Sequence, residues 1–562
     1  MESRQVGGKT RVKNSIRERM KTEPQYRREI APQTRRFRTA RSRLPVRSAV
    51  SALVLALFLV IQAQSGAFAQ AASASAPQTG DKPAAKPPAE THITPEQAKE
   101  LFRSVDELLK FASDETGLPI QHQVKRTLTT RSDVEKYLLE KFNDDQDSKR
   151  MQRSEIVLKK FGLLDHDFNL KPFMLALLKE QIAGYYDSKT KTVYLLDWID
   201  PETQKPVLAH ELTHALQDQH TDLEKWTDQT PADPSHNVNE DNDHLAKDEI
   251  DTARTAALEG QAMAVFVDYS LKPTGRSLVK NPELLEQLEN DMQGSDDSPV
   301  LARAPLLLSE SLLFPYKDGL SFEQDVWMDK GRQAAFSGVL DRPPSSSWEV
   351  INPRNYEQAK QSPVLVLPDI HPMLDKLYKP YDIGQVGQLD LRMMAQIFGG
   401  ESAAQQLTPA WDGGLYWAGQ SVGAKTSAEQ ASTSSVALLY LSAWKNTMSA
   451  HAFARMYADE LGRKYSGVKL DTASKKASSG SADEVVYTTN EGPVLIAVRD
   501  KFVFVSESFD LSLAHKLADL LIDGQGTGEI RTASVTLPRT GLSDSFVQFM
   551  HSCGMMKAAI VR

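Results

Sequence analysis

Cysteine is almost absent from this chain of 562 residues, which has a single one, Cys553. An intrachain disulfide is therefore excluded, and the folded state must depend on packing and on any metal that it binds. A lone cysteine of this kind is usually a small buried apolar residue rather than a reactive thiol.

A membrane-spanning helix of the usual length, about 20 apolar residues, is also lacking near the N-terminus. The apolar run there covers only residues 49–61 and includes Ser51. It follows an arginine-rich segment and precedes Ala-Phe-Ala at 67–69, which fits an A-x-A cleavage site. This layout predicts a secretory signal peptide over residues 1–69 with cleavage after Ala69. An uncleaved membrane anchor is the less favoured alternative, because the run is short.

Excess positive charge is confined to the same segment. Residues 1–69 contain 15 Lys and Arg against four Glu, which leaves 51 basic and 70 acidic residues in the rest of the chain. An acidic mature chain is a poor partner for nucleic acid or an anionic membrane surface. We therefore expect a periplasmic or secreted protein with no nucleic-acid partner and no stable membrane insertion after cleavage. Composition does not define its oligomeric state.

The rest of the chain predicts a linker and two α+β domains. Residues 70–92 are rich in Ala, Pro and Ser, which is typical of a disordered linker. Thr94 and Pro95 predict the start of the first helix. The length and the mixture of helical and strand patterns predict one domain over 93–380 and a second α+β domain over 381–562.

Several elements of the first domain follow from local patterns. A strand is expected at 121–128, and two β-prone runs around a polar turn predict a hairpin over 184–196. Apolar periodicity predicts helices at 172–182, 206–220, 250–269, 282–292 and 321–337. The polar, acidic stretch 228–243 predicts a surface loop, and the apolar run 364–367 predicts a strand.

The chemistry centres on the run His210-Glu-Leu-Thr-His214. Residues i and i+4 of a helix lie one turn apart on the same face, so the two imidazoles can reach one metal ion. Glu211 lies one step round the helix, where it is placed to take a proton from a metal-bound water. The run therefore predicts a zinc site with Glu211 as general base.

Zinc needs a third protein ligand, and two residues compete for this position. His220 follows His210 at the metzincin spacing, but that pattern needs glycine where this chain has Gln217. If the helix continues, His220 lies about 240° round from His214 and away from the metal. Glu259 is the alternative, an acidic residue on an otherwise small and apolar helix, where a buried carboxylate needs a partner. Asp218, one turn after His214, is a candidate to orient a ligand imidazole.

These stretches resemble a largely uncharacterised family of bacterial and archaeal gluzincin-like proteins. The family has H-E-L-T-H-A-L-Q-D-Q and a later E-G-D-A, and this chain has HELTHALQDQ at 210–219 and EGQA at 259–262. Weaker similarities lie at 184–187, 314–322, 343–356, 387–392 and 411–414, so that the resemblance spans about residues 120–460. It implies a zincin-like metallopeptidase domain over 93–380, one Zn²⁺ per chain and Glu259 as the third ligand. Gln261 stands where the family usually has Asp, and Asn352 where it often has His.

Two further features bear on catalysis. A zincin needs a donor for the oxyanion of its tetrahedral intermediate, and Tyr316 and Tyr356 are candidates, although each is also a normal packing residue. The strand at 191–196, if it lies at a sheet edge, is placed to bind an extended peptide.

The sequence thus favours an exported zinc endopeptidase that acts on peptides or proteins. The alternative is a zinc-binding protein of the cell envelope without hydrolytic activity, which the changes at Gln261 and Asn352 motivate. Cleavage specificity is not encoded in the spacing of the motifs.

Overall fold

The computed structural model describes residues 92–525, apart from 143–144, 182–183, 228–233, 286–298 and 472–482. The predicted signal peptide, nearly all of the linker and Cys553 lie outside these residues. Contacts divide the chain into Met1–Val46, which is not described, and Arg47–Arg562, to which all elements below belong. In the described part of the chain, no helix has the length and apolar character needed to cross a membrane.

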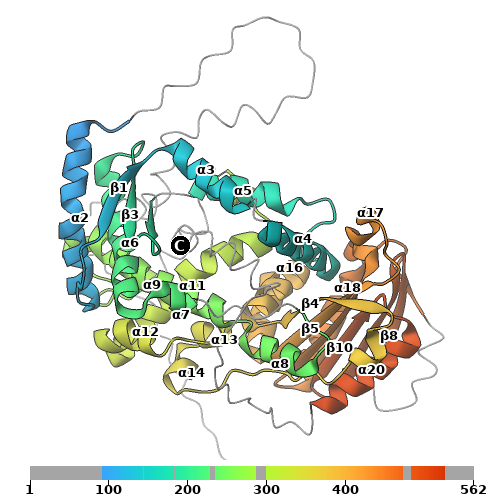
Figure 1. Cartoon of the computed structure of the whole chain (residues 1–562). Helices are drawn as coiled ribbons and strands as arrows, with labels where there is room; N and C mark the ends of the chain where they lie inside the picture. The colour runs from blue at the N-terminus through green and yellow to red at the C-terminus, as the bar shows by residue number, and fades with distance from the viewer. Residues whose placement is uncertain are drawn as a thin grey trace, which may run out of the picture. The chain divides into compact units, whose positions relative to one another are not determined.

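Helices dominate the chain before residue 378 (Figure 1). The first, α2 (Pro95–Thr116), begins as predicted. Thr94 Oγ1 accepts from the Gln97 amide at 3.2 Å, and Gln97 Oε1 accepts from the Thr94 amide at 2.8 Å, which completes a capping box. The longer helices that follow are α3 (Arg131–Phe142), α4 (Asp145–Phe161), α5 (Leu170–Gln181), α6 (Pro201–Thr221), α8 (Val238–Lys247), α9 (Ile250–Leu271) and α11 (Leu306–Lys330). The short helices are α7 (Leu223–Thr227), α12 (Val339–Asp341), α13 (Ser347–Ile351), α14 (Pro353–Glu357) and α15 (His371–Leu374).

A three-stranded sheet accompanies the first helices. It consists of β1 (Lys125–Thr129), β2 (Tyr185–Asp187) and β3 (Thr192–Leu196), in the order β1-β3-β2. β2 and β3 form the predicted antiparallel hairpin, and β1 pairs with β3 in parallel. β3 is therefore the central strand, so the condition for peptide binding at 191–196, a position at the sheet edge, is not met. The backbone groups of β3 are already used on both sides, which leaves β1 and β2 as the edges.

A seven-stranded antiparallel sheet forms the core of the later part. Its order is β4-β5-β6-β10-β9-β8-β7. The strands are β4 (Tyr378–Gln385), β5 (Trp411–Ser421), β6 (Val436–Trp444), β7 (Lys469–Leu470), β8 (Asp483–Thr489), β9 (Gly492–Arg499) and β10 (Phe502–Glu507). The accompanying helices are α16 (Gln388–Leu407), α17 (Ser427–Gln430), α18 (Thr447–Asp459), α19 (Leu461–Lys464) and α20 (Leu511–Gly524).

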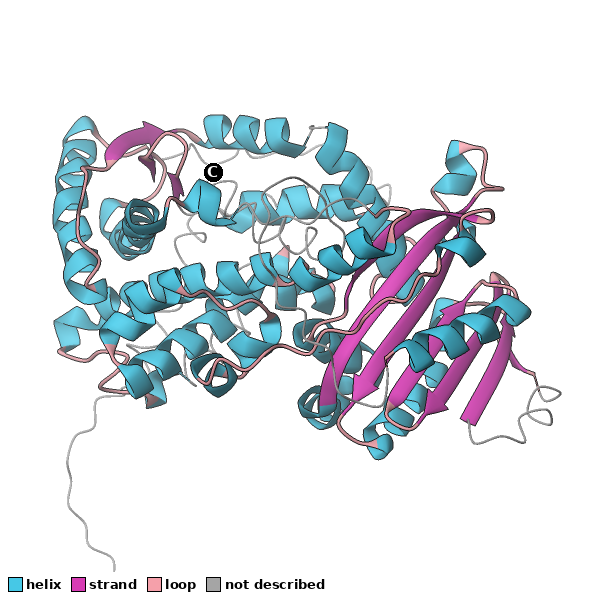
Figure 2. Cartoon of the chain, turned by 60° about the horizontal axis from the view of Figure 1, so that its bottom comes forward, coloured by secondary structure: helices cyan, strands magenta, loops and turns pink. Residues whose placement is uncertain are grey.

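Both faces of this sheet are covered, as Figure 2 shows. Tyr440 of β6 belongs to the apolar cluster that contains Phe453 of α18. Its neighbour Leu439 belongs to the cluster that contains Leu517 of α20. Successive side chains of a strand point to opposite faces, so alternate residues join different cores. This explains why every residue of β6 is buried.

The structure corrects three predicted elements. The stretch 228–243 is not all loop, because α8 begins at Val238. No strand forms at 364–367, since the N–H and C=O of Leu367 bond to the side chain of Asn242 rather than to another strand. The helix expected at 321–337 divides between two elements. Its first part is the end of α11, which begins at Leu306, contains Pro315 and stops at Lys330, and its last part lies in a π-helix, Ala334–Gly338. Most of the helix expected at 282–292 lies outside the described residues.

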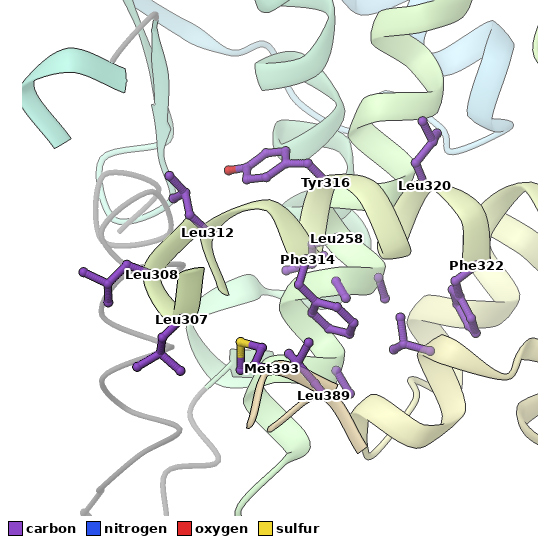
Figure 3. Close-up of a cluster of buried hydrophobic side chains, with 14 of the residues drawn as sticks. Leu258, Leu307, Leu308, Leu312, Phe314, Tyr316, Leu320, Phe322, Leu389 and Met393 are labelled. Atoms are coloured by element: carbon purple, nitrogen blue, oxygen red, sulfur yellow. The ribbon is translucent and has the colours of Figure 1, made fainter. Parts of the chain in front are cut away.

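The α+β class is confirmed, with a mixed and an antiparallel sheet among many helices. A single apolar cluster takes in residues from both sides of position 380. Figure 3 shows Phe314 of α11 close to Leu389 and Met393 of α16. The division into domains at 380 remains a prediction.

Candidate metal centre

The two histidines of the motif lie on α6, which begins five residues earlier than predicted. Asp200 caps the helix, because its Oδ1 accepts from the amides of Glu202 at 3.0 Å and Thr203 at 3.3 Å. Pro201 occupies the first turn, where a missing N–H costs little. The helix ends at Thr221, and the residue that caps it, Asp222, has a φ of 59°.

Three buried side chains converge from α6 and α9. The Nε2 atoms of His210 and His214 lie 3.2 Å apart. Oε2 of Glu259 lies 3.1 Å from the former and 3.5 Å from the latter. The described residues thus contain a compact group of two imidazoles and one carboxylate that is able to hold a metal ion.

The spacing fits tetrahedral zinc. With Zn–N and Zn–O bonds of about 2.0–2.1 Å, tetrahedral ligand atoms lie about 3.3–3.4 Å apart. The three observed separations fall on both sides of this value. Oε2 of Glu259 and Nδ1 of His210 are buried, and neither is part of a well-oriented hydrogen bond. The contacts between Oε2 and the two imidazoles are therefore better described as three ligand atoms that converge on one point than as hydrogen bonds. The three residues fit the zinc ion that the motif implies.

Without a metal, charge holds this group together. Burial alone raises the pKa of Glu259, but the two histidines outweigh it and hold the pKa well below its usual range. Burial lowers the pKa of His214, but the Glu259 charge outweighs it and raises the pKa to about 9. Metal binding must therefore displace a proton from this cluster.

Gln217 orients one of the ligand imidazoles. Its Nε2 donates to the carbonyl of Leu258 at 3.0 Å and to Oε1 of Gln261 at 2.9 Å. Its own Oε1 must then face Nδ1 of His214, 2.8 Å away, and accept the proton there. The lone pair of His214 Nε2 is consequently directed at the site. From the sequence, Gln217 was evident only as a departure from the metzincin pattern, and this role was not predicted.

Gln261, one of the two departures from the family pattern, is fully hydrogen-bonded. Its Nε2 donates to the carbonyls of Ala335 and Phe336 at 2.9 and 3.0 Å, and its Oε1 accepts from Gln217. An amide is suited to this position because it both donates and accepts.

Asn352, the other departure, lies at the end of α13. Its Nδ2 donates to the carbonyl of Trp348 at 2.8 Å and to Oε1 of Gln388 at 2.7 Å. These contacts join α13 to α16.

Glu211 is held by the hairpin that precedes its helix. Its carboxylate is buried, and Oε2 accepts from the amide N–H of Tyr186 at 2.9 Å. Burial raises the pKa of Glu211, although the neighbouring histidines counteract part of this effect. A carboxylate in such surroundings is a better proton acceptor than one in water.

Asp218 supports the hairpin rather than a ligand imidazole, contrary to the prediction. Its Oδ2 accepts from the Tyr186 hydroxyl at 2.7 Å and from Lys191 Nζ at 2.8 Å, and its Oδ1 accepts from the Leu223 amide at 3.1 Å. Asp218 thereby fixes β2, whose Tyr186 amide holds Glu211.

Of the two candidate tyrosines, the structure brings Tyr316 to the centre. It is buried, and its ring lies nearly parallel to that of His210 with centroids 6.3 Å apart. Burial, and then the charges of Glu259 and Glu211 and a hydrogen bond to Glu259, raise its pKa well above 10. In Figure 3 it projects from α11 on the side opposite Phe314, which packs in the core.

Tyr356 instead donates its hydroxyl to the Arg342 carbonyl at 2.7 Å, and its ring lies 4.0 Å from the Arg342 guanidinium carbon. These contacts make Tyr356 a packing residue.

His220 lies off the metal face, as the continued helix predicts. Its Nε2 faces Oδ1 of Asp341 at 2.9 Å. The metzincin alternative is thus not supported by the geometry.

Two glycines allow α9 and α11 to approach closely. A Cβ on Gly260 would lie 2.1 Å from the Gly319 carbonyl oxygen, and a Cβ on Gly319 would lie 2.2 Å from the Ala256 carbonyl oxygen. This contact places Glu259 and Tyr316 on adjacent backbones.

Comparisons of the chain with protein-family models, with curated proteins and with solved structures find no significant match. The function must therefore be argued from the site itself.

Proposed function

We propose that this protein is an exported zinc metallopeptidase of the gluzincin type, with a zincin-like domain before residue 380. The observation that carries the proposal is the convergence of His210, His214 and Glu259 at zinc-ligand spacing beside the buried carboxylate of Glu211. A peptide or protein is the substrate, and the predicted signal peptide accounts for export.

A zinc ion held by these three side chains would lower the pKa of a bound water to about 7 and polarise the scissile carbonyl. Glu211 takes the proton of the attacking water. The Tyr186 amide keeps the carboxylate in place for this step, because it binds one oxygen and leaves the other for the substrate side. Glu211 then passes the proton to the leaving amine.

Tyr316 is the donor to the oxyanion in this proposal. Its raised pKa keeps the hydroxyl protonated at neutral pH, so it can donate a hydrogen bond to charge that develops beside the ligands. Its ring lies beside that of His210, with centroids 6.3 Å apart, which places the side chain next to the proposed ligands.

The test is Glu211→Gln in the mature chain. We expect zinc content to stay at one equivalent at this centre while cleavage of a mixed peptide library falls by at least a thousandfold, because an amide cannot accept the proton. Glu202→Gln, an equal charge change at the exposed start of α6, is the matched control and should keep full activity. Undiminished hydrolysis in Glu211→Gln would refute the mechanism.

The competing function is zinc binding without hydrolysis. It predicts a wild type that binds zinc, cleaves no unstructured peptide and does not bind a hydroxamate. The complete hydrogen bonding of Gln261 favours an intact site over a decayed one.

A further inference from the structure

A second group of metal-ligating side chains is formed by residues that the proposed mechanism does not use. His236 lies just before α8, His371 is the first residue of α15, and Asp375 follows α15. One ligand atom of each lies within 4.8 Å of the others. The His236 side chain is 62% exposed and that of Asp375 is 34% exposed, whereas His371 is buried.

Both ring nitrogens of His371 face carboxylates. Its Nε2 lies 3.1 Å from Oδ2 of Asp241, and its Nδ1 lies 3.2 Å from Oδ1 of Asp375. A neutral imidazole has one N–H and one lone pair, so it can donate to only one of them. Asp241 is 1% exposed and has the greater need of the donor. In this neutral form the Nδ1 lone pair faces a carboxylate oxygen, so the contact with Asp375 is favourable only when a second proton or a cation lies between the two atoms.

Asp241 also fixes the chain beside the other histidine. Its Oδ1 accepts from the amide of Ser235 at 3.2 Å, and Ser235 immediately precedes His236. One buried carboxylate therefore orients the ring of His371 and positions the backbone next to His236. A carboxylate that receives the second N–H of a ligand histidine is a recurrent feature of protein metal sites.

The two imidazoles face different oxygens of Asp375. Nδ1 of His371 lies 3.2 Å from Oδ1, and the three ligand atoms lie within 4.8 Å of one another, a looser group than the first centre. Nδ1 of His236 lies 3.0 Å from Oδ2 of Asp375, close to the spacing of about 3.3 Å expected for tetrahedral zinc ligands. Two imidazoles and one carboxylate suit zinc better than Mg²⁺ or Ca²⁺, which prefer oxygen ligands. The exposure of two ligands leaves the fourth position to water.

We propose that His236, His371 and Asp375 bind a second zinc ion, with Asp241 as the residue that positions His371. The ion joins the segment before α8 to α15. The side chain of Asn242, one position after Asp241, already joins α8 to Leu367 with two hydrogen bonds, of 2.8 and 2.9 Å. The role of the second ion is thus structural, and it does not depend on hydrolysis at the first centre.

The experiment isolates this site in untagged full chain that carries His210→Ala and His214→Ala. After equilibration with Zn²⁺ and desalting, we expect one zinc per chain. Addition of Asp375→Asn or His371→Ala to this background should lower the content to near zero. Co²⁺ in place of Zn²⁺ should give the visible absorption of a four-coordinate site in the background variant alone.

A second measurement covers the case in which the double variant does not fold. In the otherwise wild-type chain, His236→Ala with Asp375→Asn should lower zinc from two equivalents to one and leave peptide hydrolysis unchanged. His92→Ala is the matched control, because Nδ1 of His92 also faces a carboxylate, Asp197 at 2.9 Å, but outside either group of candidate ligands. An unchanged zinc content in the paired variant would overturn the proposal and leave His371 in an ion pair only.

Discussion

Gly260→Ala tests how closely the helix that carries Glu259 must approach its neighbour. An added Cβ would lie 2.1 Å from the Gly319 carbonyl oxygen, so the helices must separate by about 0.9 Å to reach even 3.0 Å. Helix propensity alone predicts a gain of about 0.5–1 kcal/mol for this change. Overpacking against rigid backbone costs about 1–3 kcal/mol, and we expect the cost to prevail.

The same displacement should weaken metal binding. Ligand distances at a zinc site tolerate about 0.2 Å, and Glu259 is adjacent to the new side chain. We expect Tm in the presence of a chelator to fall by a few degrees and zinc affinity, measured by competition with a chromophoric chelator, to fall about tenfold or more.

Gly462→Ala is the matched control for this experiment. Gly462 also lies in a helix, but a Cβ there meets no atom within 4 Å, so its Tm should stay equal or rise. If Gly260→Ala behaved like Gly462→Ala in both Tm and zinc affinity, the reasoning about the close helix crossing would be refuted.

Five other substitutions test the ligands, their supports and one buried carboxyl group, that of Glu249. His220→Ala should keep zinc whereas Glu259→Ala loses it, and the reverse result in metal analysis would restore the metzincin alternative. Gln217→Ala should lower zinc affinity about 10–100-fold, because His214 loses its orienting partner. Asp218→Asn should keep the zinc affinity and lower the rate of hydrolysis. If the two variants bound zinc equally well, the role of Gln217 would be contradicted. Burial raises the pKa of Glu249 to about 7. The unfolded chain loses this proton near pH 4.5 and the folded chain only near 7, so stability falls as pH rises between these values. Glu249→Gln should therefore increase the free energy of unfolding at pH 8 by at most about 3 kcal/mol, which thermal denaturation would record as a higher Tm. At pH 4.5 the substitution should have little effect. Equal shifts in Tm at both pH values would contradict the assignment.

Local patterns predicted much of the fold. Caps such as Thr94 act within one turn, and the strand and turn residues of the hairpin at 184–196 determine a local pairing, so both are readable from the sequence. The strand expected at 364–367 failed because its Leu367 backbone pairs with a side chain 125 residues away. Whether a short apolar run forms a strand depends on which backbone or side chain lies beside it, and the residues of the run do not indicate that partner.

Part of the candidate metal site could likewise be predicted from the sequence, and part could not. The sequence by itself determined that His210 and His214 share one face and that Glu211 lies beside them, since residues i and i+4 of a helix lie about one turn apart on the same face. It also determined that His220 leaves that face if the helix continues. Only the tertiary structure placed Oε2 of Glu259 within 3.5 Å of both imidazoles, because the approach of α9 depends on packing rather than on spacing along the chain.

The supporting residues were decided by tertiary contacts as well. Asp218 has the spacing of a residue that orients a ligand imidazole, but its carboxylate accepts a hydrogen bond from Tyr186 of the β2–β3 hairpin. The residue that faces His214 is Gln217. Tyr316 and Tyr356 are equivalent in the sequence, and only the course of α11 brings the former to the ligands. Helical periodicity thus defines which side chains share a surface, whereas the partners that meet that surface are set by the packing of distant elements.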